Sequence, residues 1–204
     1  MVATTHDPSE RAKQERRRQI MGAAKGVFAE AGYHGASIHA IIERAQIARG
    51  TFYLYFESKS AVFSSILDQA MTDLRARIHR IEVDDPKALA PQIQLRTQIV
   101  DALDYVVRDR ALALLLLSAG HTPDAEAAER LDQFWAEIRS LLERAFESGL
   151  EIKLLRKVNP QLAAAAMLGM IRGVVEQLSS QPTPPSVETV VDELLIIALR
   201  GVLA

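Results

Sequence analysis

The chain has 204 residues, of which 49% are hydrophobic and 25% are charged. This is the composition of a folded globular protein, and it excludes disorder over most of the length. There is no cysteine, which excludes a disulfide framework, a cysteine-ligated metal site and a thiol nucleophile, and which favours the reducing cytoplasm. Taken alone, the net charge of −2 argues against a nucleic-acid partner, because phosphate binding depends on basic residues.

Residues 1–16 are polar and basic, and we expect them to form a flexible arm. They contain no apolar run of the kind that a secretory signal needs. The most apolar runs of the chain, 111–117 and 194–199, are far shorter than the roughly 18 residues of a membrane-spanning helix. No membrane segment is therefore expected.

Three short helices are predicted in the next part of the chain, 17–60. Apolar residues recur at helical spacing from residue 17, and Gly32 can end this first helix. Ser37 can cap a second helix that ends near Ala45. After only three residues, a third helix is predicted over 49–56, with Phe52 and Phe56 one turn apart on its inner side. Two short helices joined by a three-residue turn form a candidate helix-turn-helix.

Helical periodicity continues through residues 61–204. A long helix that begins at Ser58 or Ser60 is predicted to run to about residue 80, before Pro86 breaks the pattern. Further helical patterns cover about 88–108, 110–119, 124–148, 160–179 and 187–203. The chain is therefore predicted to be all-α with about nine helices: a three-helix lobe over 17–60 and a larger helical domain over 61–204.

The charge is divided unevenly between these two parts. Residues 1–60 hold nine basic and six acidic residues, a net charge of +3, and the remainder carries −5. Seven of the eleven aromatic residues lie between Phe28 and Phe63, where a small unit needs large side chains to form a core. The N-terminal part is thus predicted to be a separate basic lobe, to which the objection from total charge does not apply.

The outer face of the third helix is unusual for a surface exposed to water. Opposite Phe52 and Phe56 lie Gly50 and Leu54, flanked by Thr51 and Tyr53, with no acidic residue. A DNA major groove fits this face, because Gly50 permits close approach, Leu54 can contact a thymine methyl, and the hydroxyls of Thr51 and Tyr53 can donate hydrogen bonds. The alternative is a plain helical corner within a bundle.

The run from Ser37 to Lys59, with its core Arg-Gly-Thr-Phe-Tyr-x-Tyr-Phe-x-Ser-Lys, resembles the DNA-binding domain of the TetR/AcrR family of bacterial transcriptional regulators. The resemblance covers roughly 17–65. It implies that Ser37 touches a phosphate and that Tyr55 and Lys59 grip the DNA backbone. It implies that the groove-facing surface consists of Arg49, Gly50, Thr51, Tyr53 and Leu54.

Two positions depart from the family pattern. Gln46 stands where the family usually has glycine, so the turn is either strained or built differently. His39 stands where a longer charged residue is common. It can contact a phosphate when protonated, or it can be a plain exposed histidine.

The larger domain is expected to form a homodimer, because one recognition helix reads only a few base pairs. The last two helices are the candidates for the interface, which the resemblance implies is a four-helix arrangement. The first of them carries small residues at close spacing, which would let another helix approach: Ala165, Ala166, Gly169 and Gly173. The second carries an apolar stripe that includes Val191, Leu194, Leu195 and Ala198. Ile196 and Ile197 lie off this stripe. Burial within a monomeric bundle is the alternative.

The middle helices are expected to sense a small molecule. Methionine and aromatic side chains that could line an apolar cavity are Met71, Tyr105, Phe134, Trp135, Met167 and Met170. Arg108 and His121 could add polar contacts, although all these residues also suit a plain core or loop. The resemblance thus implies a ligand-responsive repressor that binds a palindromic operator as a dimer and that a small, largely apolar effector releases.

Other classes of function have less support. No nucleophile–base arrangement, glycine-rich phosphate loop or metal-ligating histidine spacing is present, so neither an enzyme nor a cofactor is expected. An all-helical protein-interaction module that uses Tyr53 and Leu54 is the alternative to DNA binding. Salt dependence separates the two, because only phosphate contacts weaken steeply with added salt.

Overall fold

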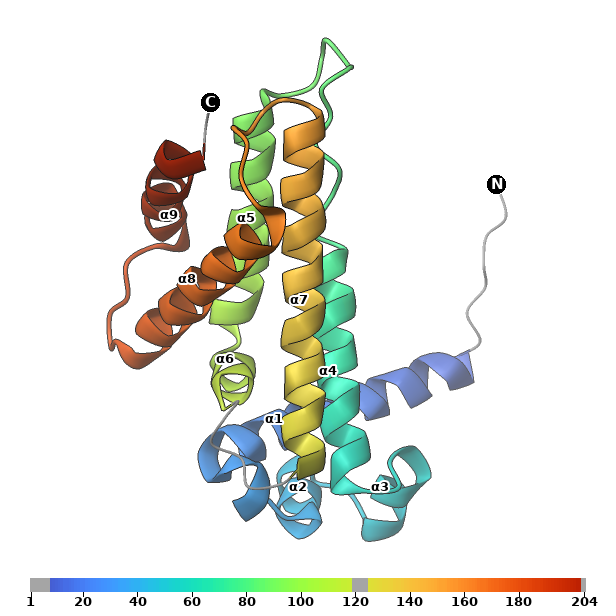
Figure 1. Ribbon diagram of the computed structural model, residues 1–204. Helices are drawn as coiled ribbons and strands as arrows, with labels where there is room; N and C mark the ends of the chain where they lie inside the picture. The colour runs from blue at the N-terminus through green and yellow to red at the C-terminus, as the bar shows by residue number, and fades with distance from the viewer. Residues whose placement is uncertain (1–7, 119–124, 203–204) are drawn as a thin grey trace.

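The computed structural model describes residues 8–118 and 125–202 (Figure 1). Over these residues the chain forms only α-helices, which confirms the all-α prediction. They are α1 (Pro8–Gly35), α2 (Ile38–Ala45), α3 (Arg49–Tyr55), α4 (Lys59–Arg75), α5 (Pro91–Arg108), α6 (Arg110–Leu117), α7 (Ala125–Glu151), α8 (Pro160–Ser180) and α9 (Val187–Val202). Helices α2 and α3 lie at one end of the molecule, and the long helices α4, α5 and α7 run away from that end (Figure 1).

Helix α1 begins earlier than expected. Residues 8–16, which we expected in the flexible arm, are helical, whereas residues 1–7 lie outside the described residues. Pro8 suits the first position of a helix, where the missing N–H has no partner to lose. Glu10 then lies 4.0 Å from Lys13, and Glu15 lies 3.3 Å from Arg18, one helical turn away in each case. Such exposed pairs add a few tenths of a kcal/mol each to the stability of the helix.

The turns of the N-terminal lobe follow the predicted signals. Gly32 has a φ of 69° and ends the straight part of α1. The Ser37 hydroxyl accepts a hydrogen bond of 3.1 Å from the Ala40 amide and so caps α2. Gln46 adopts the left-handed conformation, with φ 52° and ψ 48°. The turn therefore keeps the geometry that suits glycine, and Gln46 bears the strain that this geometry imposes on a side chain.

Two helix ends in the larger domain differ from the prediction. Helix α4 ends at Arg75, and not near residue 80, and α5 begins at Pro91, and not near residue 88. Proline is favoured in the first turn of a helix, and the residue before it is disfavoured in the helical conformation. The apolar spacing across 76–90 therefore predicted more helix than the backbone can form.

The hydrophobic core is continuous through both parts of the chain. One cluster of buried residues extends from Phe28 and Phe63 to Leu112, Leu131 and Val191. Helix α1 packs against α6, and α4 packs against α7. The N-terminal lobe is therefore joined to the larger domain by packed helices, and the expected boundary at residue 60 falls in the first turn of α4.

Polar contacts fix α4 to α7 along the length of α4. Asp68 of α4 accepts a hydrogen bond of 2.7 Å from Arg130 of α7. Towards the far end of α4, Arg75 pairs with Glu137, and in its first turn the Ser60 hydroxyl bonds Glu126. Because these contacts lie at both ends and near the middle, the two helices are held together as a unit.

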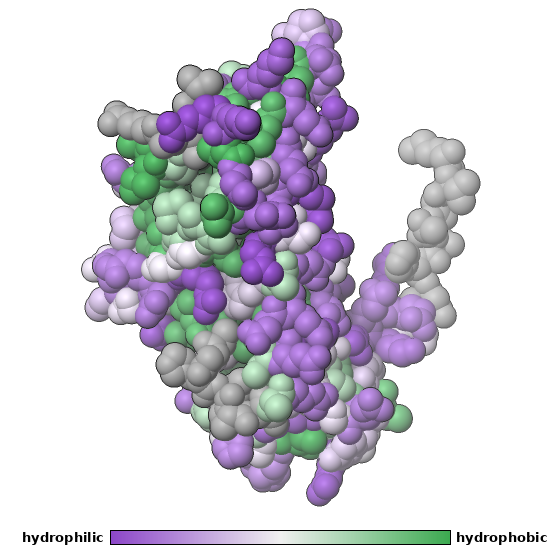
Figure 2. All heavy atoms as spheres, viewed as in Figure 1, coloured by the Kyte–Doolittle hydropathy of each residue, from purple (hydrophilic) through white to green (hydrophobic). Residues whose placement is uncertain are grey.

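Helix α8 leaves an apolar surface uncovered. Leu162 of α8 is 71% exposed, and Ile197 of α9 is 63% exposed. Figure 2 shows apolar residues gathered over α8 and α9. Among the helices in 8–118 and 125–202, only α8 is long and apolar enough to cross a membrane. Little of its surface is buried within the chain. The sequence analysis predicted this helix over 160–179 but did not single it out as long and apolar enough to cross a membrane, because it considered only the uninterrupted apolar runs 111–117 and 194–199.

Candidate nucleic-acid interface and effector cleft

Helix α3 is held from one side and open on the other. Phe52 is fully buried and Phe56, just after the helix, is nearly so. On the outer side Leu54 is 81% exposed and Tyr53 is 45% exposed. The division into an inner aromatic side and an outer apolar side is thus the one that the spacing predicted. Exposure of this apolar surface to water is unfavourable, unless another molecule docks there.

Gly50 is not required by the fold. A Cβ atom placed on Gly50 would meet nothing within 4 Å, apart from its own helix backbone and chain neighbours. The left-handed conformation that favours glycine is also not adopted there. Glycine destabilises a helix by roughly 0.5–1 kcal/mol relative to alanine. Nothing within the chain itself therefore requires a glycine at this position.

The other expected contact residues surround this face. The Arg49 guanidinium lies 5.9 Å from the centre of the Tyr53 ring, and the Thr51 side chain is half-buried. At the start of α2, Ser37 and His39 are exposed, and His39 Nε2 lies 3.3 Å from a Glu43 carboxylate oxygen. Tyr55 is half-buried and packs against the core.

Lys59 differs from the expectation. Its ammonium donates hydrogen bonds of 2.7 Å to the Tyr33 carbonyl oxygen and 3.1 Å to that of Ala36. It also lies 4.3 Å from the centre of the Tyr33 ring. These carbonyls follow the break in α1 and have lost their helical partners, so a cation is well placed beside them. In this conformation Lys59 braces the corner between α1 and α2 and does not reach outwards.

Arg17 is a residue that the sequence analysis did not single out. One of its terminal nitrogens donates to the Ser65 hydroxyl over 2.8 Å, and the other lies 3.4 Å from the Tyr55 carbonyl oxygen. Its guanidinium lies 4.5 Å from the centre of the Phe56 ring. Arg17 thereby joins the C-terminal end of α3 to α1 and α4. The available signal was its position one turn before the buried Ile20, on the inner side of α1.

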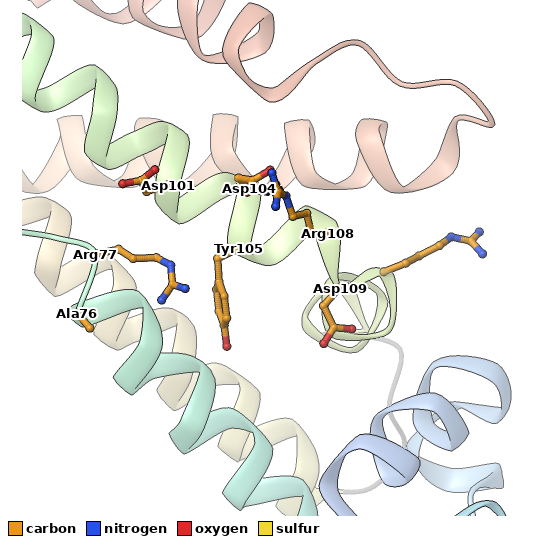
Figure 3. A pocket seen from close by; sticks show the side chains of 8 residues that line it. Ala76, Arg77, Asp101, Asp104, Tyr105, Arg108 and Asp109 are labelled. Carbon is orange, nitrogen blue, oxygen red and sulfur yellow. Dashed lines mark hydrogen bonds and ion pairs between the residues drawn. The ribbon is translucent and has the colours of Figure 1, made fainter. Parts of the chain in front are cut away.

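An open cleft of about 810 Å³ lies between α4, α5 and the start of α6 (Figure 3). Its lining residues are Ala76, Arg77, Asp101, Asp104, Tyr105, Arg108, Asp109 and Arg110. Of the residues expected to contact an effector, the cleft brings together only Tyr105 and Arg108. Its lining is charged, and not apolar.

The remaining residues expected to contact an effector do not line an open cavity. Met71, Phe134 and Trp135 are buried in the core. The Trp135 indole N–H donates to the Leu116 carbonyl oxygen over 3.3 Å, which satisfies it within the chain. Met167 and Met170 are half-buried on α8, and His121 lies outside the described residues. The expected apolar cavity is therefore packed core in this conformation, because these side chains fill the space between their helices.

Tyr105 is the most perturbed group of the cleft. Burial, together with the hydrogen bond of 2.9 Å that its hydroxyl donates to Asp73, raises the pKa of Tyr105 above its ordinary value. The Arg77 guanidinium lies 4.3 Å from the centre of its ring. The phenol therefore stays protonated at any physiological pH and holds α5 against α4.

The predicted interface residues are exposed on α8 but mostly buried on α9. The small residues of α8 are exposed, as a contact surface requires: Ala165, Ala166, Gly169 and Gly173. On α9, however, Val191, Leu194 and Ala198 are buried within the chain itself, and Leu195 is half-buried. Helix α9 packs mainly on α5, so the predicted stripe faces inwards. Ile196 and Ile197 remain on the outer side.

Within the described ranges, no group of three or more histidine, aspartate and glutamate side chains could hold a metal ion.

Comparison with known proteins identifies the N-terminal part first. Residues 20–66 match the model of the bacterial regulatory proteins of the tetR family. The HTH-type transcriptional repressor KstR of Mycobacterium tuberculosis is 30% identical over 139 residues, which are 68% of this chain and 61% of that protein. The match therefore spans about three fifths of the length of that repressor.

Solved structures resemble the whole chain. The fatty acid degradation regulator FadR from Bacillus halodurans has a TM-score of 0.75 and 21% identity, with 97% of this chain and 98% of that chain covered. The transcriptional regulator FadR from Bacillus subtilis, solved in complex with stearoyl-CoA, has a TM-score of 0.75 and 22% identity and covers 90% of this chain and 98% of that chain. At this level of identity the likeness establishes the fold.

Proposed function

The chain belongs to the tetR family of bacterial regulatory proteins, and we propose that it is a transcriptional repressor that binds double-stranded DNA through α3. The observation that carries this proposal is the outer face of α3, where an exposed Leu54 lies beside a glycine that the fold does not need. A helix with such a face can enter a major groove closely. A repressor that binds DNA works in the cytoplasm, so the same proposal places the protein there.

The contacts divide into two kinds. On α3, base edges are contacted by Arg49, Gly50, Thr51, Tyr53 and Leu54. Around it, Ser37, His39 and Tyr55 contact phosphates, while Lys59 braces the lobe from within. The first kind specifies the sequence, and the second positions the helix.

The repressor is proposed to act as a homodimer through α8 and α9. Exposed small residues on α8 allow a second helix to approach closely, and exposed Leu162, Ile196 and Ile197 supply apolar area. A second copy of the chain covers this surface by twofold symmetry. The two recognition helices would then meet half-sites about 34–36 Å apart in a palindromic operator.

The DNA-binding proposal is tested by selecting bound fragments from random duplexes. The expected result is an inverted repeat whose affinity falls steeply with added salt, because phosphate contacts release counterions. A protein-interaction module would select no sequence, and its binding would respond little to salt. Recovery of no motif at low salt would therefore contradict the proposal.

The dimer is tested by Gly169→Gln in the middle of α8. A Cβ at Gly169 meets nothing within 4 Å in the chain itself, so the variant should fold. We expect it to sediment as a monomer and to lose operator binding. Gly22→Gln is the matched control, because Gly22 is equally open but lies on α1. A dimeric Gly169→Gln variant would place the interface elsewhere.

The larger domain is proposed to receive a small-molecule effector that releases the DNA. The relative from Bacillus subtilis with this fold was solved with stearoyl-CoA. An effector can release DNA only if it binds more tightly to a conformation that does not fit the operator. The cleft between α4, α5 and α6 is one open site among the described residues of the domain that could receive it.

A further inference from the structure

One ion pair joins the three N-terminal helices directly to the larger domain. Lys25 of α1 pairs with Asp109, and among the described residues this is the only ion pair between α1–α3 and α5–α9. The Lys25 side chain is 25% exposed and that of Asp109 is 35% exposed, so water screens the pair only in part. Around the pair, α1 packs on α6, where Ala113 and Leu116 are buried.

The fold itself holds Asp109 in place. This residue lies between α5 and α6, with φ −95° and ψ 83°. One carboxylate oxygen accepts a hydrogen bond of 3.0 Å from the Leu112 amide and so caps α6, and the other oxygen pairs with Lys25. Figure 3 shows Asp109 at the junction of α5 and α6, with its carboxylate directed towards α1. A single carboxylate thus ties α1 to the point where α5 and α6 meet.

The orientation of α1 in turn sets that of the recognition helix. Gln19 of α1 donates a hydrogen bond of 2.7 Å to the Ala45 carbonyl oxygen at the end of α2. Arg17 of α1 lies 3.4 Å from the Tyr55 carbonyl oxygen at the end of α3. Because α1 is bonded to the ends of both α2 and α3, the three helices form one unit. A rotation of α1 on α6 therefore rotates α3 as well.

We propose that Lys25 and Asp109 are positioning residues for DNA binding: their pair fixes the angle of α1 on α6, and with it the angle at which α3 meets the operator. The proposal rests on the proposed function. Apolar packing is not directional, whereas a charged hydrogen bond to a fixed acceptor is. A lobe that is already held in place loses less freedom when two recognition helices bind one operator. The pair therefore strengthens DNA binding without contacting DNA.

Two variants with opposite changes of charge test this role. Lys25→Met removes a positive charge and Asp109→Asn removes a negative one, while asparagine keeps the cap of α6. If charge alone acted on DNA, the first variant would bind the operator more weakly and the second more tightly. If the pair positions the lobe, both variants should bind about threefold or more weakly in a fluorescence anisotropy titration. Lys25→Arg keeps the charge and should retain most of the affinity.

The double variant and a matched control complete the titration. Lys25→Met combined with Asp109→Asn should bind no more weakly than either single variant, because both changes remove the same contact. Asp101→Asn is the control, because Asp101 is an exposed aspartate of α5 outside the pair, and its loss should leave the affinity unchanged. Opposite effects of the two single variants, unchanged affinity in both, or tighter binding in both would overturn the proposal.

The position of the lobe is measured separately, without DNA. Because the chain has no cysteine, spin labels can be attached at Ala31→Cys on α1 and Ala136→Cys on α7, both of which are exposed positions. Labelled chains diluted with unlabelled ones report the distance within one chain.

The distribution of this distance should broaden in Lys25→Met and in Asp109→Asn, but not in Asp101→Asn. Equal widths in all of these variants would overturn the proposal. If the original protein bound no DNA, the proposed function would fail instead, and the distance distributions would still decide whether the pair holds the lobe on the larger domain.

Discussion

Replacement of Gly50 by alanine separates the needs of the fold from those of DNA binding. The added methyl group meets nothing within 4 Å in the chain, so it causes no clash. Alanine stabilises a helix relative to glycine by roughly 0.5–1 kcal/mol, and the free energy of unfolding should rise by up to this amount. Against a DNA groove the same methyl is crowded, and crowding of a packed contact costs about 1–3 kcal/mol. Operator affinity should therefore fall roughly 5- to 150-fold.

The two effects are measured by urea denaturation and by fluorescence anisotropy with an operator fragment. Gly22→Ala is the matched control, because a Cβ on Gly22 also meets nothing within 4 Å. It should gain similar stability and keep its DNA affinity. If Gly50→Ala bound the operator as tightly as the original protein, α3 would not approach DNA through Gly50, and the main argument for the groove-facing surface would fail.

Three further variants test the lobe and the α5–α9 contact. Gln46→Gly should stabilise the protein by about 0.5–1 kcal/mol in urea denaturation, because the left-handed turn strains glutamine; a loss of stability would contradict this. Arg17→Met should lower operator affinity without changing the salt dependence of binding, because Arg17 positions α3, whereas loss of a phosphate contact would reduce the salt slope by about one. Arg18→Met controls for loss of positive charge on α1. Hydrogen bonds from Arg96 hold the pKa of the Asp192 carboxyl below its usual range in the folded protein. The ionised Asp192 therefore stabilises the fold above its unfolded pKa of about 3.9, and this contribution is lost as the pH falls through its folded pKa. Asp192→Asn should therefore melt below the original protein at pH 7, and the difference should close below about pH 4; a difference independent of pH would refute the assignment.

Local spacing was enough to predict the N-terminal lobe. The caps, the three-residue turn and the inner and outer faces of α3 depend on residues within one or two turns of each other, and the structure has them as predicted. The strained turn at Gln46 was also open to prediction, because the backbone needed there depends on the turn and not on the side chain.

Contacts between distant segments were not open to prediction in this way. The inward position of Lys59 depends on the carbonyls of Tyr33 and Ala36, which the break at Gly32 brings beside α4. The orientation of α9 depends on α5, so an apolar stripe alone could not show that Val191 faces its own chain. In each case helical periodicity gives the face of a helix but not the neighbour that covers it.

The residues that line the candidate effector cleft could not be predicted from the sequence either. Methionine and aromatic residues suit both a cavity and a packed core, and only the distances between helices decide which one forms. The charged cleft combines residues from the end of α4 with a stripe on α5 and the start of α6. Its members give no motif in the sequence, because most charged residues at helical spacing simply face solvent.

The polar contacts between α4 and α7 have a mechanical consequence. A helix of 17 residues is about 25 Å long, so in the proposed repressor α4, braced on α7, would act as a lever arm between the cleft and α3. A tilt of about 5° over such a length moves the far end by about 2 Å. In a symmetric dimer the two ends move in opposite directions, so their separation changes by about 4 Å, which exceeds the 3.4 Å rise of one base pair. A tilt of this size would thus put the two recognition helices of the proposed dimer about one base pair out of register.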